Sequence, residues 1–314
     1  MSTIKNYLSL VKFSHTIFAM PFALIGFFLG IDEYGFIDSY YGNSKYEYFD
    51  FYPNSSVPPY LNSLQWAGVS FLLVILCMVF ARSAAMAFNR YLDRDIDALN
   101  PRTAIREVPR GIITPKNALT FTIVNCILFI VCTYFINTLC FFLSPVALAV
   151  VLGYSYTKRF TPLCHLILGV GLSLAPIGAY LAVIGQFHWL PILFSLAVIF
   201  WVSGFDIIYS LQDEEFDKSQ QLYSMPAWLG KAKALGVSEL LHLLSAACVV
   251  AAGKLGGFGW LYWLGVLVFI GMLVYQHSIV KPNDLRRVNL AFMTANGIAS
   301  VVFAVFVIAD LFIN

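Results

Sequence analysis

Two groups of aspartate residues stand about 120 residues apart in a chain that otherwise consists mostly of apolar residues. The two groups are Asn89-x3-Asp93-x3-Asp97 and Asp206-x6-Asp213-x3-Asp217. Each stands at the end of a long apolar run, where an ionised carboxylate is costly unless a counter-charge offsets it. A divalent metal ion that carries a phosphorylated ligand would supply this charge, because Mg²⁺ takes oxygen ligands and is usually held by one or two carboxylates together with substrate phosphates. The alternative is that these acids only cap and solvate helix ends beside basic residues.

The spacing within each group predicts which side chains share a helix face. Residues four apart form a column, and residues seven apart differ by only about 20° in direction. Arg82 is therefore expected on the face of Asn89, roughly 10 Å deeper at 1.5 Å per residue, and Asp206 has the same relation to Asp213. The pattern predicts one cavity with carboxylates at its rim and with Arg82 and Asp206 below. In the other interpretation, Arg82 and Asp206 form a buried ion pair with each other.

A third polar segment, from Gly153 to Arg159, ends another apolar run with the sequence GYSYTKR. Tyr154 and Lys158 are four residues apart and so share a helix face. Lys158 is placed to contact a phosphate, with Tyr154 below it as a hydrogen-bond donor or as an aromatic wall. Taken alone, Lys158 and Arg159 also fit the basic flank that many membrane proteins carry, so both interpretations stay open.

The composition shows which solvent surrounds the elements that carry these residues. Hydrophobic residues make up 60% of the 314 residues and charged residues 11%, and the mean hydropathy is +0.78. Soluble domains carry about 25% charged residues, so the chain is expected to be a polytopic membrane protein. A helix needs about 20 apolar residues to cross the hydrocarbon layer. Runs of this kind lie near residues 15–31, 64–88, 118–136, 140–157, 163–184, 190–211, 234–253, 258–278 and 289–312.

The basic residues predict the orientation of these runs in the membrane. If the N-terminus is cytoplasmic, all 19 lysines and arginines except Lys45, Lys254 and Arg82 fall on the cytoplasmic side, as the positive-inside rule requires. Both aspartate groups then lie at the cytoplasmic face, and the segment at about 32–63 forms an extracytoplasmic loop. The net charge of +2 is spread over separate loops and gives no indication of nucleic-acid binding.

Taken together, the three motifs resemble those of the UbiA superfamily of intramembrane aromatic prenyltransferases. The stretch Ala81 to Asp97, with Arg102 and Arg106 after it, resembles the first aspartate motif and its cytoplasmic loop. Tyr154 to Lys158 resembles the YxxxK motif, and Asp206 to Asp217 resembles the second aspartate motif. The pattern is most similar to that of 4-hydroxybenzoate polyprenyltransferases and their relatives in quinone synthesis, including the menaquinone branch.

This resemblance implies a fold and an activity. The fold is an all-α bundle of about nine transmembrane helices that forms a single prenyltransferase domain over residues 1–314, with a cavity open to the cytoplasm and laterally to lipid. The activity is Mg²⁺-dependent transfer of a polyprenyl group from an allylic polyprenyl diphosphate to 4-hydroxybenzoate or a dihydroxynaphthoate. The protein is then a multi-pass protein of the cell (inner) membrane, with its N-terminus and active site cytoplasmic.

The resemblance and the spacing together assign roles to individual residues. The expected Mg²⁺ ligands are Asn89, Asp93, Asp97, Asp213 and Asp217. The expected substrate-binding residues are Arg82, Asn89, Lys158, Arg102, Arg106 and Tyr209. The expected catalytic residues are Asp206, Tyr154 and Lys158.

Two positions depart from the family pattern. Asn89 is followed by Arg90, where many members have Asn-Asp, so Arg90 is not expected to bind metal and is expected to place a cation at the rim. Many members also have a glycine near Gln221. An ion-coupled transporter is the main alternative function, since intramembrane carboxylates also mark cation pathways. Haem, chlorophyll or ether-lipid synthesis would be alternatives within the same superfamily.

Overall fold

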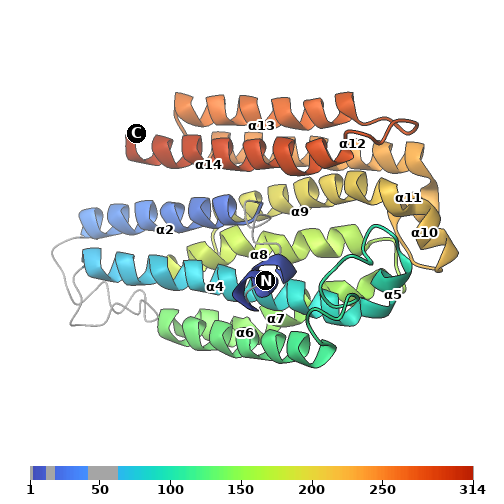
Figure 1. The fold of residues 1–314 in the computed structure, drawn as a ribbon. Helices are drawn as coiled ribbons and strands as arrows, with labels where there is room; N and C mark the ends of the chain where they lie inside the picture. The colour runs from blue at the N-terminus through green and yellow to red at the C-terminus, as the bar shows by residue number, and fades with distance from the viewer. Residues whose placement is uncertain (1–2, 12–17, 42–62, 314) are drawn as a thin grey trace.

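The computed structural model describes residues 3–11, 18–41 and 63–313, which form helices joined by turns and loops (Figure 1). In this described part, eight helical segments are long and apolar enough to cross a membrane. Their helices are α4 (Ser63–Leu92), α6 (Pro115–Ile136), α7 (Thr138–Thr157), α8 (Cys164–Ile184), α9 (Trp189–Ser210), α12 (Lys231–Leu255), α13 (Trp260–Ile279) and α14 (Asn296–Ile313), which follows a π-helical turn at Leu290–Ala295. The prediction of an all-α polytopic membrane protein is confirmed.

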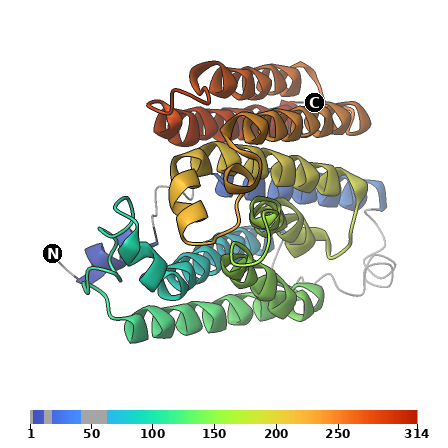
Figure 2. The same cartoon turned by 90° about the vertical axis from the view of Figure 1, so that its right-hand side faces the viewer.

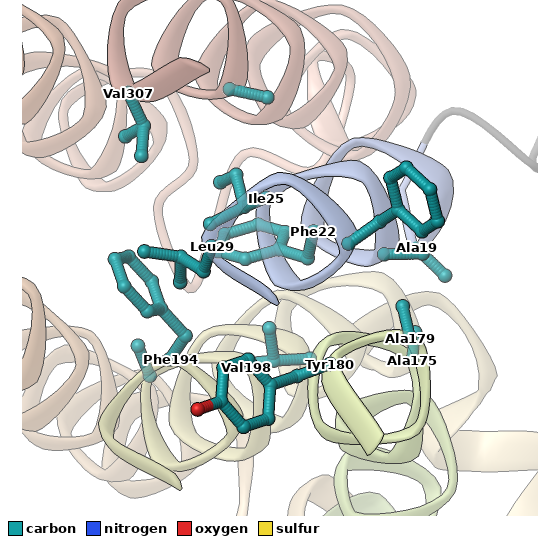
Figure 3. Packing of buried hydrophobic residues seen from close by; sticks show 14 of the residues in the cluster. Ala19, Phe22, Ile25, Leu29, Ala175, Ala179, Tyr180, Phe194, Val198 and Val307 are labelled. Atoms are coloured by element: carbon teal, nitrogen blue, oxygen red, sulfur yellow. The ribbon is translucent and has the colours of Figure 1, made fainter. Parts of the chain in front are cut away.

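Helix α2 (Met20–Tyr41) occupies the place of the first predicted apolar run and lies at the centre of the bundle. Figure 3 shows Phe22 and Ile25 of α2 between α14 on one side and α8 and α9 on the other. At Gly26 the helix backbones approach so closely that a Cβ atom would lie 2.0 Å from the carbonyl oxygen of Pro176 in α8. Small residues permit such close helix packing in membranes, so Gly26 fixes α2 against the helix that begins beside the site.

The predicted end of the first run is wrong. The run was expected to end at residue 31 and to be followed by a loop at about 32–63, but α2 continues to Tyr41. Asp32 and Glu33 end the apolar run without ending the helix, because backbone hydrogen bonds do not depend on side-chain polarity. The remainder of that predicted loop, residues 42–62, lies outside the described residues.

The motif-bearing helix ends gather at one end of the bundle. The C-terminal ends of α4, α7 and α9 lie there together with the short helices α5 (Arg94–Leu99), α10 (Glu214–Ser219) and α11 (Met225–Leu229). Figure 2 shows this end facing the viewer. Up-and-down connections bring α4, α7 and α9 to the same side because each is separated from the next by a helix that runs back.

Candidate active site

The first aspartate group lies where α4 ends and α5 begins. Asp93 separates the two helices, yet its backbone N–H donates to the carbonyl of Asn89 (2.9 Å), and the N–H of Asp97 donates to the carbonyl of Asp93 (2.7 Å). The predicted spacing by four residues therefore survives the break between the helices.

Asp93 is held by two cations from the end of α7. Lys158 Nζ lies 2.6 Å from Oδ2 of Asp93, and Arg159 Nη2 lies 2.9 Å from Oδ1. Asn89 Nδ2 also donates to Oδ2 (3.0 Å), and Asp93 is only 1% exposed. Arg159 is thus a residue of the site that spacing did not reveal, because the spacing by four residues joins only Tyr154 and Lys158.

Asp97 is paired with Arg106 from the loop that joins α5 to α6. Arg106 Nη1 donates to both carboxylate oxygens, at 2.7 and 2.8 Å, and Asp97 is 3% exposed. The hydroxyl of Thr103 donates to the backbone carbonyl of Asp97 (3.1 Å). These bonds fold the loop back against the end of the first aspartate group.

The second aspartate group does not continue as one straight helix. α9 ends at Ser210, a 3₁₀ turn covers Leu211–Asp213, and α10 begins at Glu214. The helix expected to carry Asp206, Asp213 and Asp217 is thus interrupted by a turn with 3.0 residues per turn rather than 3.6, yet all three side chains line the same cavity.

Asp213 and Asp217 have different partners. Arg102 donates to both oxygens of Asp213, with Nε 3.0 Å from Oδ1, and Asn100 Nδ2 donates to Oδ1 at 3.2 Å. Asp217 accepts a hydrogen bond of 2.8 Å from the hydroxyl of Ser224, the N-cap residue of α11. Asp217 therefore has no cation partner within 4 Å among the described residues.

Arg102 connects the first motif's loop to the second motif. Its Nη1 donates to the hydroxyl of Tyr209 (2.8 Å), and its guanidinium lies over the Tyr209 ring at 5.1 Å. Burial disfavours the charge, but the hydrogen bonds to Asp213 and Tyr209 raise the pKa of Arg102 above its ordinary value. Arg102 is therefore a permanent cation that joins the two aspartate groups.

A polar cavity of about 450 Å³ lies between the two groups. Its walls include the predicted residues Asn89, Arg102, Arg106, Tyr154, Lys158, Asp206, Tyr209, Asp213 and Asp217. Asp93 and Asp97 do not line it, because the cations that bind them stand between these two carboxylates and the cavity. The expected rim of acids is present on the side of the second group, while on the side of the first group cations form the surface.

An apolar cavity of about 360 Å³ adjoins the polar one. Met86, Tyr154 and Leu168 line both cavities, so Tyr154 stands at their boundary. Most of the other residues around the apolar cavity are aliphatic side chains of α4, α7 and α8, and Arg82 is the charged residue in its wall. The site thus combines a charged cavity with an apolar cavity.

Arg82 and Asp206 do not form the ion pair that was considered. Arg82 lines the apolar cavity and has no carboxylate within 4 Å among the described residues, and its Nε is buried without a hydrogen-bond partner. Asp206 lines the polar cavity and is bound by His165, with Nδ1 2.7 Å from Oδ2. The two side chains were expected at a similar depth, but the packing of α4 and α9 places them in the walls of different cavities.

His165 is a further residue of the site that the sequence did not single out. It is 3% exposed, and its Nε2 accepts a hydrogen bond of 3.2 Å from the backbone N–H of Met225. A backbone N–H can only donate, so Nε2 carries no proton and Nδ1 carries one, which it donates to Asp206. This geometry makes His165 a hydrogen-bond donor that orients Asp206.

Both departures from the family pattern are resolved by the structure. Arg90 was expected to place a cation at the rim, and it lies in the wall of the polar cavity with only 4% exposure. Gln221 has a φ of 54°, which is the left-handed region that favours glycine. The turn after α10 therefore keeps a left-handed residue although its side chain is not that of glycine.

These features define a class of protein: a membrane-embedded helical enzyme whose charged cavity adjoins an apolar one. The chain belongs to the UbiA prenyltransferase family, whose sequence model matches residues 60–298. It is therefore a prenyltransferase, and the ion-coupled transporter considered above is set aside.

Individual relatives agree with this assignment. A 4-hydroxybenzoate octaprenyltransferase of Aliivibrio fischeri (strain MJ11) is 30% identical over 234 residues, which cover 74% of this chain and 80% of the relative. Another protein of that name, from Aeromonas salmonicida (strain A449), is 31% identical over 236 residues, with 74% and 80% covered.

Solved structures share the fold. The apo structure of a UbiA homologue from Aeropyrum pernix K1 has a TM-score of 0.73 and 27% identity, and the match covers 95% of this chain and 97% of that one. A UbiA homologue from Archaeoglobus fulgidus bound to DMAPP and Mg²⁺ has a TM-score of 0.70 at 19% identity, covering 98% and 100%. The bundle seen here is thus the fold of this family.

Proposed function

We propose that this protein transfers a polyprenyl group from an allylic polyprenyl diphosphate to 4-hydroxybenzoate, in an Mg²⁺-dependent reaction. The observation that carries the proposal is the boundary at Tyr154 between a charged cavity and an apolar one. An allylic diphosphate has the matching chemistry, with a polyanionic head and a hydrocarbon tail. The names of the relatives in Aliivibrio fischeri and Aeromonas salmonicida support 4-hydroxybenzoate as the acceptor.

The donor atoms around the polar cavity fit Mg²⁺. They are carboxylate and amide oxygens, and Mg²⁺ prefers oxygen ligands. Among the described residues, no three His, Cys, Asp or Glu side chains gather into a ready metal site. Such a cluster is not required, because Mg²⁺ is usually held by one or two carboxylates together with substrate phosphates and water. The Archaeoglobus fulgidus homologue bound to DMAPP and Mg²⁺ supports the same choice of metal.

We assign the ligands from both sides of the cavity. Asp213 and Asp217 line it directly, and Asn89 faces it from α4. Asp93 and Asp97 join them once their cations release them. When bound to these residues, Mg²⁺ supplies positive charge that stabilises the diphosphate as a leaving group.

The cations of the cavity have a complementary role. Lys158, Arg102 and Arg106 line the cavity while they bind Asp93, Asp213 and Asp97 in that order. The diphosphate brings new negative charge into the polar cavity, where each of these cations already neutralises an acid. The three side chains then exchange a carboxylate for phosphate oxygens, a contact for which Arg and Lys are both suited.

Breaking the C–O bond produces an allylic carbon cation that must not meet water. Tyr154 at the boundary and Tyr209, whose ring lies 4.2 Å from that of Phe292 at 31°, supply aromatic walls near the diphosphate. Aromatic faces attract cations, and a closed cavity excludes water. The electron-rich acceptor ring forms the new C–C bond, pyrophosphate leaves, and the ring then loses one proton.

We assign the acceptor to the boundary between the cavities. The buried guanidinium of Arg82 has no carboxylate partner among the described residues, so it is suited to bind the acceptor's carboxylate. Asp206, oriented by His165, accepts a hydrogen bond or proton from the hydroxyl side of the ring. Tyr154 lies beside both groups because it lines both cavities.

The positive-inside rule gives the orientation. The helix ends that carry the site also carry Arg102, Arg106, Lys158 and Arg159. We infer that this end faces the cytoplasm and that the protein spans the cell (inner) membrane, with the diphosphate head at the cytoplasmic leaflet.

We expect Arg82→Ala to raise the KM for 4-hydroxybenzoate roughly 10- to 100-fold, because hydrogen bonds to charged groups contribute about 1.5–3 kcal/mol and 1.4 kcal/mol is a factor of ten. The KM for the polyprenyl diphosphate should change much less. Steady-state kinetics with each substrate varied in turn measures both constants. Equal effects on the two KM values would contradict the assignment of Arg82 to the acceptor.

A direct assay tests the function. Membranes that contain the protein are incubated with labelled polyprenyl diphosphate, Mg²⁺ and either 4-hydroxybenzoate or a dihydroxynaphthoate, and the lipid extract is analysed. We expect prenylated 4-hydroxybenzoate, and none after chelation of the metal. A product with only the dihydroxynaphthoate would move the protein to the menaquinone branch, and no product with either acceptor would overturn the proposal.

A further inference from the structure

Arg90 is a cation in the wall of the polar cavity that forms no ion pair with a carboxylate of the described residues. It is 4% exposed and lines the cavity. Its Nη1 donates to Oδ1 of Asn89 at 3.0 Å, while its Nε is buried and has no hydrogen-bond partner. Among the described residues, no Asp or Glu lies within 4 Å of its guanidinium, although Arg90 is nearly as buried as the acids of the first group.

The other cations around this cavity are each bound to an acid. Arg102 is paired with Asp213, Arg106 with Asp97, and Lys158 with Asp93. In each pair one cation contacts one carboxylate, and Asp93 is also bound by a second cation, Arg159. The nearby Asp97 is already bound through both carboxylate oxygens by Arg106. None of the acids in this network is therefore available to pair with Arg90.

An unpaired guanidinium is costly at this degree of burial. Removing a charge from water is strongly unfavourable unless a counter-charge and hydrogen bonds replace the solvent. A guanidinium has five N–H donors, and hydrogen bonds to an amide oxygen do not neutralise charge. Arg90 lies in the last turn of α4, where the helix dipole favours a cation, but that effect is weak beside the loss of hydration. Since no carboxylate of the described residues contacts this guanidinium, the geometry favours an anion from a bound ligand.

We propose that Arg90 binds the diphosphate directly and orients it in the polar cavity. A planar guanidinium with several free donors matches phosphate oxygens in a bidentate manner. Asn89 orients Arg90 through Oδ1 and orients Asp93 through Nδ2, so one amide couples the phosphate-binding cation to the first aspartate group. This inference rests on the proposed function, because it takes the polar cavity to be the diphosphate site.

The test compares Arg90→Gln, Arg90→Lys and the control Arg94→Gln. Arg94 lies on the same stretch of chain but is bound to Asp95 and the Tyr91 carbonyl and does not line the cavity. The probe is inorganic pyrophosphate, whose dissociation constant is measured on the purified protein by calorimetry and whose inhibition constant is measured against prenyl transfer. The KM values for polyprenyl diphosphate and for the acceptor are measured alongside.

We expect Arg90→Gln to weaken pyrophosphate binding and to raise the KM for polyprenyl diphosphate, both by roughly 10- to 100-fold, the usual effect of losing hydrogen bonds to a charged group. The acceptor KM should stay within about twofold, and Arg94→Gln should match the wild type. Arg90→Lys keeps the charge without the planar fork, so its pyrophosphate affinity should fall between those of the wild type and Arg90→Gln.

Two outcomes would overturn the inference. One is unchanged pyrophosphate affinity in Arg90→Gln. The other outcome, which decides the test if Arg90→Gln does not fold, is that Arg90→Lys binds pyrophosphate as tightly as the wild type. Failure of the proposed function is distinguishable, because in that case the wild-type protein itself would neither bind pyrophosphate nor be inhibited by it.

Discussion

Asp213→Asn should reduce the turnover number for prenyl transfer by roughly a thousandfold while the protein remains folded. Asp213 lines the polar cavity and is proposed to bind Mg²⁺, and groups that stabilise developing charge contribute about 10²- to 10³-fold each. The substitution keeps the shape of the side chain and removes its charge. It also leaves Arg102 without its carboxylate, so the loop that carries Arg102 loses its link to the second motif.

The measurement is product formation at saturating substrate, with thermal unfolding of the purified protein as the check on folding. Glu215→Gln is the matched control, because Glu215 lies two residues further on, is exposed, and does not line the cavity. It should keep wild-type activity. Turnover above a tenth of the wild-type value in Asp213→Asn would show that this carboxylate is not needed for the chemistry.

The second large effect concerns the orientation of Asp206. We expect His165→Gln to lower the turnover number roughly 10- to 100-fold, the range seen when a group that orients a functional side chain is removed. His165→Asn should retain most of the activity. The amide nitrogen of asparagine occupies about the place of Nδ1 and can still donate to Asp206, whereas the longer glutamine places its polar group nearer to Nε2, which accepts from Met225.

The pair of variants separates two roles of His165. If His165 matters only because it accepts the Met225 N–H and ties α8 to α11, then His165→Gln should be the more active of the two. Turnover, acceptor KM and the pH dependence of kcat for both variants give the answer. A pH profile that shifts in His165→Gln and not in His165→Asn would agree with a role of the Nδ1 hydrogen bond to Asp206.

Much of the fold could be predicted because it depends on local composition. Apolar runs of about 20 residues identified the spans α4, α6 to α9 and α12 to α14 to within a few residues. Runs of this kind are set by the thickness of the hydrocarbon layer. The end of α2 was missed because Asp32 and Glu33 mark where the apolar run stops, and a helix can continue beyond that point.

The relation between Arg82 and Asp206 could not be predicted in the same way. A helical wheel assumes a straight helix of constant pitch and says nothing about which neighbour a face meets. The chain departs from a straight helix at Asp93 and again in the 3₁₀ turn at Leu211–Asp213. Packing of α4 against α6 and α7 then turns Arg82 into the apolar cavity, while α8 supplies His165 to Asp206.

The sequence alone determined that this is a helical membrane protein with polar motifs at the ends of three of its helices, because hydropathy and residue spacing are local properties of the chain. Only the tertiary structure decided which cation meets which acid. The contacts of Lys158 with Asp93 and of Arg102 with Asp213 join residues that are 65 and 111 positions apart, and such contacts depend on how the helices pack. The same packing buries Arg90 without a carboxylate partner in the described part of the chain, which its position in the motif did not indicate.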